Sequence, residues 1–318
     1  MNKALQLLMA AVIMTGFAAC SSDEDLPTKN YADTPMSLSA GITMPSTRAG
    51  YDSDTDLQSS DFGLFVSTAG STQGEVNYDK YNATNMKCSY TGGAWGTAEQ
   101  LLWKGNSNQV TYYAYMPYNA DSNMNPESYS FDVKENQTAA EDIKASDFLL
   151  STKKTVTAAA EGVNGTLPIA FDHVLSKLTV KLTKGTELAD DVTFTTVTIK
   201  KCALSATINL STKAITTDNN TTGDILMHSV AANEEYQAII MPQTFAQTDS
   251  NPLTIEIYSS DGKTYLFIAD KKLTFVSGYN YTLPITVGRD KVVPSGIQAN
   301  PWSNATEDGS ASGSLETE

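Results

Sequence analysis

Short stretches in which apolar and polar residues alternate recur along this 318-residue chain, with turn residues between them. Such alternation is typical of strands with one buried face, and no long segment has the 3.6-residue apolar spacing of a helix. Thr138–Ile143 is expected to form a short helical turn, and Asp261-Gly262 a hairpin turn. Many short strands with almost no helix predict an all-β fold of β-sandwiches. The predicted strands are Phe62–Thr68, Gln109–Met116, Tyr129–Val133, Phe148–Ser151, Leu167–Phe171, Leu175–Leu182, Thr193–Lys200, Leu204–Leu210, Tyr236–Met241, Leu253–Tyr258, Lys263–Ala269 and Tyr279–Val287.

An earlier stretch has the clearest alternation in the chain. Its even positions are all apolar and its odd positions are Ser, Gly or Thr; the apolar residues are Met36, Leu38, Ala40, Ile42 and Met44. At ~3.4 Å per residue the stretch predicts a half-buried strand of about 30 Å. Arg48 and Ala49 follow it, and residues 51–56 are expected to form an acidic loop.

The N-terminus has the pattern of an export signal. Lys3 is followed by an apolar run from Leu5 to Phe17, which is shorter than a membrane-spanning helix and ends in small residues. Phe17-Ala-Ala-Cys20 resembles a bacterial lipobox, in which Cys20 becomes the acylated first residue; the alternative is an ordinary signal peptide with a stray Cys. The acidic run that follows, residues 21–25, resembles a surface-export signal of Bacteroidetes lipoproteins, or is a solvated linker.

Composition argues against several classes of function. With 21 basic and 36 acidic residues the formal charge is −15, which disfavours nucleic acid as a partner. Two His and three Cys leave little for a metal centre or a His-based triad, so no catalytic residue, metal or cofactor is predicted. Asp52, Asp54 and Asp56 have the spacing of a Ca²⁺ loop, but Leu57 and Gly63 stand where that loop needs Gly and Glu.

The remaining chemistry-bearing residues have structural interpretations. His173, in a strand-like stretch, is expected to be a half-buried, hydrogen-bonded structural residue. Cys88 and Cys202 are either two buried thiols or an interdomain disulfide. The aromatic residues Trp95, Trp103 and those of 112–118 form either sandwich core or a glycan-binding platform.

Several segments, taken in order, resemble the fimbrillin family, the FimA-like type V pilins of Bacteroidetes. The lipobox is followed by the alternating strand and by Thr47-Arg48-Ala49, and Asp61-Phe-Gly-Leu-Phe-Val66 is similar to the family's GVFAY-type strand. The other similar segments are Trp103 with Val110-Thr-Tyr-Tyr-Ala-Tyr-Met-Pro-Tyr118, Asp147-Phe-Leu-Leu150, Phe171-Asp-His-Val-Leu-Ser-Lys-Leu178, Ile240-Met-Pro-Gln243, Tyr279-Asn-Tyr281 and Ile297 to Trp302.

This resemblance implies two tandem transthyretin-like (Greek-key) β-sandwich domains. A polar stretch near 161–165 provides the boundary between them. The predicted organisation is a lipoprotein signal peptide (1–19), an acidic linker with the first strand, removed as a propeptide (20–48), an N-terminal sandwich (49–162), a C-terminal sandwich (163–290), and a C-terminal extension with a candidate donor strand and a mobile tail (291–318).

The resemblance also implies a mode of assembly. A lipoprotein precursor, anchored in the outer membrane through Cys20, is cut between Arg48 and Ala49 by an Arg-specific surface protease. Removal of the strand 36–44 leaves an apolar groove that accepts a strand from another fimbrial subunit, a second copy or an accessory protein. The candidate donor strand carries Val292, Val293, Ile297, Ala299 and Trp302, but Trp302 falls on the face opposite Ile297 and Ala299, and Pro294 and Pro301 remove donor N–H groups.

The sequence therefore predicts a structural and adhesive subunit of a cell-surface fimbria, with a surface ligand that is not specified. Three alternatives remain open. One is an uncleaved tip or anchor component of the fimbria, and another is a monomeric outer-membrane lipoprotein that binds glycans. The third is a surface glycosidase or peptidase, which would require two acidic side chains that converge in a cleft.

Overall fold

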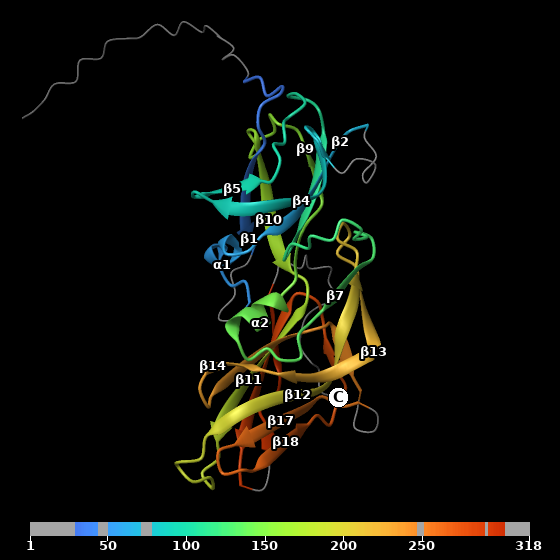
Figure 1. The fold of residues 1–318 in the computed structure, drawn as a ribbon. Helices are drawn as coiled ribbons and strands as arrows, with labels where there is room; N and C mark the ends of the chain where they lie inside the picture. The colour runs from blue at the N-terminus through green and yellow to red at the C-terminus, as the bar shows by residue number, and fades with distance from the viewer. Residues whose placement is uncertain (1–28, 44–49, 71–77, 247–250, 290–291, 303–318) are drawn as a thin grey trace, which may run out of the picture. The chain divides into compact units, whose positions relative to one another are not determined.

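A computed structural model of the chain describes residues 29–43, 50–70, 78–246, 251–289 and 292–302. The described residues from Tyr31 onward belong to one compact unit. In its described part, strands dominate and helix is limited to α1 (Asp54–Gln58) and α2 (Ala140–Ala145), as Figure 1 shows. Neither has the length and hydrophobicity of a membrane-spanning helix. The predicted all-β class is confirmed.

The first sheet closes on itself. Its strands run in the order β2-β4-β5-β1-β10-β8-β6-β9, with β3 on β4, and β2 also pairs with β6. Seven of these strands, all except β3 and β9, therefore form a ring. The bounds are β1 (Ser37–Ile42), β2 (Phe62–Thr68), β3 (Tyr78–Asp79), β4 (Asn82–Thr91), β5 (Ala94–Thr97), β6 (Val110–Met116), β8 (Leu149–Ser151), β9 (Lys154–Val156) and β10 (Thr166–His173).

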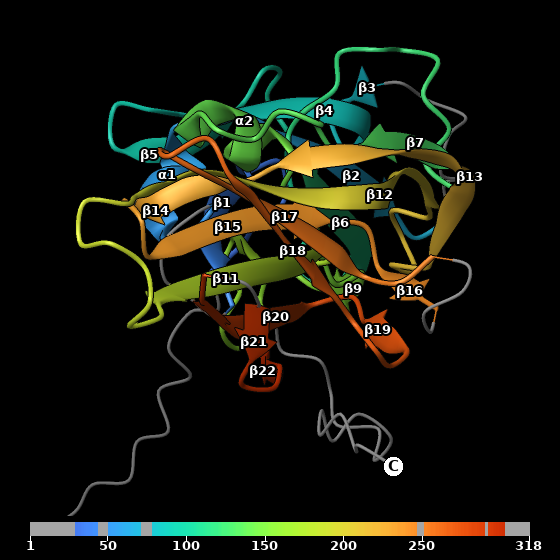
Figure 2. The ribbon, with the colours of Figure 1, turned by 90° about the horizontal axis from the view of Figure 1, so that it is seen from below.

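The rest of the described chain forms a six-stranded, a five-stranded and a two-stranded sheet. One sheet has the order β14-β15-β11-β20-β21, with β22 also on β20, and Figure 2 shows β20, β21 and β22 in red at its edge. The other has the order β13-β12-β17-β18, with β7 on β12, and β16 pairs with β19. The bounds are β7 (Tyr129–Asp132), β11 (Ser176–Lys184), β12 (Phe194–Ile208), β13 (Ile215–Leu226), β14 (His228–Ala231), β15 (Glu235–Ile240), β16 (Gln243–Phe245), β17 (Thr254–Ser259), β18 (Thr264–Ile268), β19 (Leu273–Phe275), β20 (Tyr279–Val287), β21 (Val292–Pro294) and β22 (Gln298–Pro301).

Buried apolar side chains form two clusters that share some strands. In β6, Tyr112 and Ala114 belong to the cluster inside the ring, whereas Tyr113 and Tyr115 belong to the larger cluster between the other sheets. Successive residues of a strand point to opposite faces, so β6 is covered on both sides. This arrangement explains why its aromatic run has almost no polar positions.

Most predicted strands are present, with three differences. The predicted strands 193–200 and 204–210 are one strand, β12, which is irregular near Lys201 (φ +53°). The expected acidic loop 51–56 contains the start of α1, because the Ser53 side chain caps the helix by accepting from the Asp56 N–H. Eight further strands were not predicted: β3, β4, β5, β9, β13, β14, β16 and β19. Gly262 at φ +80° confirms the turn at 261–262.

Strand pairing crosses the predicted domain boundary at 162/163. β10 lies after the boundary and pairs with β1 and β8 of the ring. β7 lies before the boundary and pairs with β12. The boundary stays a prediction, and the two parts of the chain exchange one strand each across it.

Candidate functional site

β1 occupies a position that closes the ring. It pairs in parallel with β10 from Ser37↔Thr166 to Ile42↔Phe171, and it meets β5 only through the pair Leu38↔Trp95. Figure 1 shows β1 in blue beside β10. Without β1 the order of strands would be interrupted between β5 and β10. Its neighbours would then have backbone groups with no strand to pair with.

The inward side chains of β1, and that of Met36 directly before it, lie in the ring's core. Met36, Leu38 and Ile42 are each less than 10% exposed, Ala40 is half-buried, and Met44 lies outside the described residues. The three large side chains contribute a gross ~1.5–3 kcal/mol each, or about 5–9 kcal/mol together. The strand predicted to fill a groove therefore contributes substantially to the core.

Hydrogen bonds from backbone N–H groups hold both ends of this segment. Upstream, the Asp33 N–H donates to the Trp103 carbonyl (2.8 Å) and the Met36 N–H donates to the Leu101 carbonyl (2.8 Å). Downstream, the Ile42 N–H donates to Asp54 Oδ1 (2.9 Å), which lies in α1. The contact between β1 and α1 connects the strand to the chain that follows the predicted cut.

The predicted lipidation and processing residues, Cys20, Arg48 and Ala49, lie outside the described residues, so these assignments stay predictions. The chain is described again from Gly50, next to the predicted cut. The Tyr51 N–H donates to Asp147 Oδ2 (2.9 Å), and Tyr51 itself is buried. The chain after the predicted cut is therefore held in the protein interior from its first described residues.

Gly50 has a conformation and surroundings that other residues tolerate poorly. Its φ is +99°, and a Cβ there would lie 2.5 Å from Asp147 Oδ2. We expect Gly50→Ala to destabilise the protein by about 1–3 kcal/mol more than Gly70→Ala, because Gly70 has a similar φ (+91°) with nothing within 4 Å. Urea unfolding of both variants measures this difference. Equal losses would contradict the close approach to Asp147.

The candidate donor residues lie against their own chain. β21 and β22 pair antiparallel with β20, from Val287↔Val292 to Tyr279↔Pro301. Val292, Ile297 and Ala299 are half-buried against the larger cluster, and Val293 is exposed. Trp302 is 2% exposed and comes directly after β22, so its burial does not depend on the alternation of that strand. The role of these residues as a donor strand stays a prediction.

A buried polar cluster lies beside Trp302. The Trp302 ring stacks on His173 (centroids 3.9 Å apart), and His173 Nδ1 lies 3.1 Å from Asp147 Oδ1. Lys177 Nζ lies 4.6 Å from the Trp302 ring centroid and 3.6 Å from Asp52 Oδ1. Burial lowers the pKa of Lys177, while Asp52 and Asp147 oppose this effect. His173 is structural and hydrogen-bonded as predicted, but it is fully buried rather than half-buried.

The two cysteines are free and buried, so the alternative of an interdomain disulfide is wrong. Burial raises the pKa of the Cys88 and Cys202 thiols well above the ordinary value. Both thiols are therefore poor nucleophiles.

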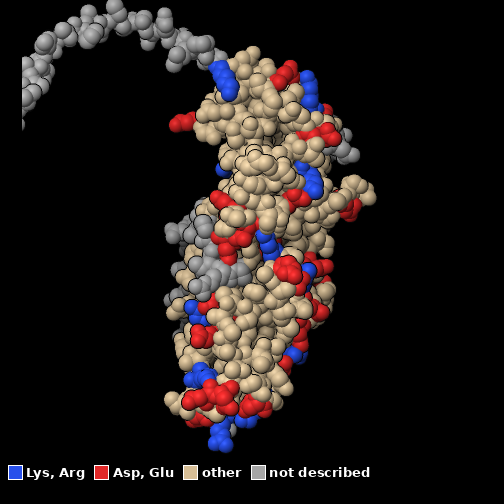
Figure 3. All heavy atoms as spheres, turned by 60° about the vertical axis from the view of Figure 1, so that its left-hand side comes forward, with Lys and Arg blue, Asp and Glu red and all other residues tan. Residues whose placement is uncertain are grey.

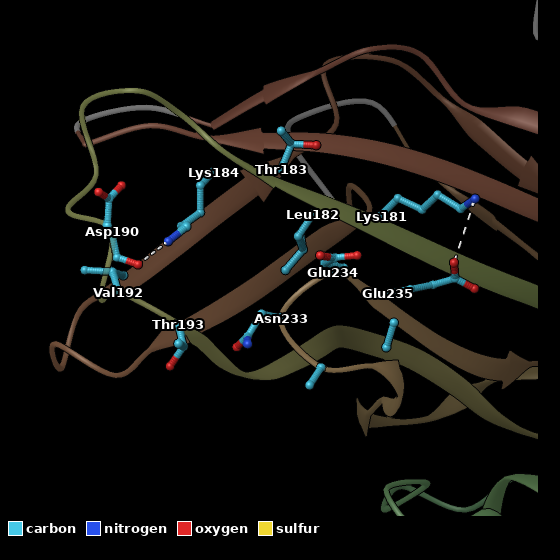
Figure 4. Close-up of a pocket in the computed structure, with 12 residues that line it drawn as sticks. Lys181, Leu182, Thr183, Lys184, Asp190, Val192, Thr193, Asn233, Glu234 and Glu235 are labelled. Carbon is cyan, nitrogen blue, oxygen red and sulfur yellow. Dashed lines mark hydrogen bonds and ion pairs between the residues drawn. The ribbon is translucent and has the colours of Figure 1, made fainter.

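A polar hollow of about 720 Å³ lies beside the ends of β11 and β15 (Figure 4). Lys181 pairs with Glu235 (3.8 Å), and Lys184 donates to the Asp190 carbonyl (2.6 Å).

Among the described residues, no group of three or more His, Cys, Asp or Glu side chains could hold a metal ion. On the face in Figure 3, acidic and basic side chains are interspersed over a largely uncharged surface. The hollow therefore offers no defined reaction chemistry.

Comparisons with known proteins show which family and fold the chain resembles. A model of the fimbrillin-like family matches residues 47–302. The fimbrium subunit Fim1C of Phocaeicola vulgatus is 21% identical over 295 residues, which cover 86% of this chain and 76% of that protein. A candidate fimbrium tip subunit, Fim1C of Bacteroides ovatus, is 23% identical over 205 residues, or 57% of this chain; the match spans 35% of that relative's length.

A solved structure shares the fold. The crystal structure of a candidate cell adhesion protein from Bacteroides ovatus has a TM-score of 0.64 and 16% identity. The match covers 85% of this chain and 98% of that one. At this identity the likeness concerns the fold alone.

Proposed function

The chain belongs to the fimbrillin-like family, and we propose that it is a structural subunit of a cell-surface fimbria. Its relatives include a named fimbrium subunit, which supports assembly with other fimbrial subunits and a structural rather than an enzymatic role. In this proposal the chain folds as two tandem transthyretin-like sandwiches, and the fimbria carries the protein on the cell surface.

One observation carries the mechanism: β1 alone bridges β5 and β10, and it ends shortly before Arg48. A cut between Arg48 and Ala49 would leave the strand held by non-covalent contacts only. Its loss would open the ring and expose an apolar slot lined by Trp95 and Phe171, each of which packs against Phe62. A strand from a neighbouring subunit could then restore both the backbone pairing and the buried surface.

The donor in this mechanism is the segment that carries Val292, Ile297 and Ala299 in a second copy. β21 and β22 have an exposed face and pair with β20 alone among the described strands, which supports the idea that this segment can detach from its own subunit. Before assembly, the precursor is held in the outer membrane by fatty acyl chains on Cys20. The cut by an Arg-specific surface protease then separates the subunit from this anchor.

Substitution of Arg48 tests the proposal, because Arg48 and Arg289 are the two arginines of the chain. Arg48→Ala should abolish SDS-resistant polymers on cells and leave a monomer that begins at Cys20. Arg289 is exposed and precedes β21, so Arg289→Ala is the matched control and should assemble normally.

Electrophoresis of unboiled surface material and N-terminal sequencing measure both outcomes. Polymers formed by Arg48→Ala would contradict processing as the switch for assembly. A wild-type protein that stays monomeric with Cys20 as its first residue would instead support an anchor component or a monomeric lipoprotein.

A further inference from the structure

Residues that follow the predicted cut and Trp302, which follows the candidate donor strands, meet in one closed circuit of contacts. Asp52 lies 3.6 Å from Lys177, and Lys177 lies 4.6 Å from the Trp302 ring centroid. Trp302 stacks on His173, whose Nδ1 lies 3.1 Å from Asp147. Asp147 in turn accepts the N–H of Tyr51, the neighbour of Asp52. The chain next to the cut and the end of the candidate donor segment therefore share their partners.

Trp302 is the main anchor of the C-terminal segment. In the described range 292–302 it is the one buried residue; the others are exposed or half-buried. Its backbone N–H donates to the carbonyl of Gly278 (2.6 Å), the residue just before β20. Removal of the ring from its seat would leave β21 and β22 held by edge pairing with β20, which is weak support for strands of this length.

The packing of the Trp302 ring depends on residues 50–52. Lys177, under the ring, has no exposed side-chain surface, and the Asp52 carboxylate helps to keep it charged. A buried ammonium that loses a carboxylate partner is strongly destabilised. A change at Asp52 should therefore disturb Lys177, on which the Trp302 ring packs. β1 in turn restrains this stretch, through the hydrogen bond from Ile42 to Asp54.

We propose that the buried Trp302 ring holds β21 and β22 on β20, and that its position depends on residues 50–52. Loss of the N-terminal strand would then loosen β21 and β22 from β20. The inference rests on the proposed processing at Arg48 and deepens it. The cut would not only open an acceptor groove but also free the candidate donor in the same subunit. An uncut subunit would keep both ends closed.

Hydrogen exchange of the purified, uncut, full-length monomer tests this coupling. Asp52→Asn should accelerate exchange in peptides that cover 298–302 by at least about 5-fold, the lower end of typical coupling between sites. Asp172→Asn is the matched control, because Asp172 has similar side-chain exposure (13% against 15%) and pairs with Lys213 rather than Lys177. Exchange between β11 and β20 should be unchanged in both variants, which shows that they are folded.

Coupling must also act in reverse, by the same factor. Trp302→Ala should therefore accelerate exchange at the Tyr51 amide, whereas Trp302→Phe, which keeps a ring over His173, should have a smaller effect. The proposal is overturned if Asp52→Asn matches Asp172→Asn at 298–302, or if Trp302→Ala leaves Tyr51 unaffected. Because these measurements use an uncut monomer, their failure would leave the proposed function intact, and assembly of Arg48→Ala would overturn that function separately.

Discussion

After the purified protein is cut at Arg48, a labelled peptide of residues 31–43 is expected to replace the cut strand, and Leu38→Asp in the peptide should abolish the exchange. Leu38 is 9% exposed and opposes Trp95 in β5, so the Asp variant would lose its apolar contacts and bury a carboxylate. At ~1.5–3 kcal/mol for the leucine alone, with the charge in addition, affinity should fall by at least ~100-fold.

Ser39→Asp in the same peptide is the control, since Ser39 is an exposed neighbour in the same strand. It should bind within about 3-fold of the unmodified peptide. Fluorescence anisotropy measures the exchange, and Arg289→Ala in the protein confines an Arg-specific protease to Arg48. Equal binding of the two Asp peptides would mean that the peptide does not enter the slot. An unmodified peptide that never replaces the cut strand would mean that β1 is a permanent part of the fold.

Sequence reasoning succeeded where one local pattern decides the structure. Tyr279–Val287 alternates strictly, and β20 has these same bounds. The alternation of residues 36–44 also predicted that Leu38 and Ile42 of β1, and Met36 directly before it, are buried. A period of two residues fixes which face is buried, so this information is present in the chain itself.

Local patterns failed where distant segments decide the structure. β13 is rich in Thr, Asn and Asp and largely exposed, and it is a strand because it pairs along most of β12. β10 follows the polar stretch at the predicted domain boundary, and nothing in its own sequence shows that it pairs in parallel with β1 of the ring. Pairing between remote strands leaves no mark on the composition of either.

The cluster beside Trp302 shows the same limit for the candidate site. Asp52 appeared as part of an acidic loop, and Lys177 as one residue of a family-like stretch. Lys177 is fully buried, and a lysine is rarely buried in this way unless it has a charged partner. The charge pair forms because the chain just before α1 places Asp52 against Lys177 of β11, and no spacing in the sequence encodes that contact.

The protein is expected to lose stability at alkaline pH. Burial raises the pKa of Tyr51 and Tyr112 to about 12, and also raises the pKa of Tyr113 and Tyr115. These groups bind their protons more tightly in the folded state than in the unfolded one. Their contribution to stability is therefore complete below pH 10, and it is lost as the pH rises from 10 through 12. The protein should unfold cooperatively in this range.

The pKa of Tyr51 sets the expected size of this loss of stability. The difference between 10 and 12 in its pKa corresponds to about 2.7 kcal/mol, so Tyr51→Phe should reduce the alkaline loss of stability by about that amount. Tyr78→Phe, at an exposed position, should behave as the wild type. Urea unfolding at pH 9 to 12, with tyrosinate absorbance and circular dichroism recorded together, measures both. Tyrosinate signals of Tyr51 that appear before the fold is lost would mean that its hydroxyl titrates in the folded protein, and that the buried ring next to the cut does not resist deprotonation.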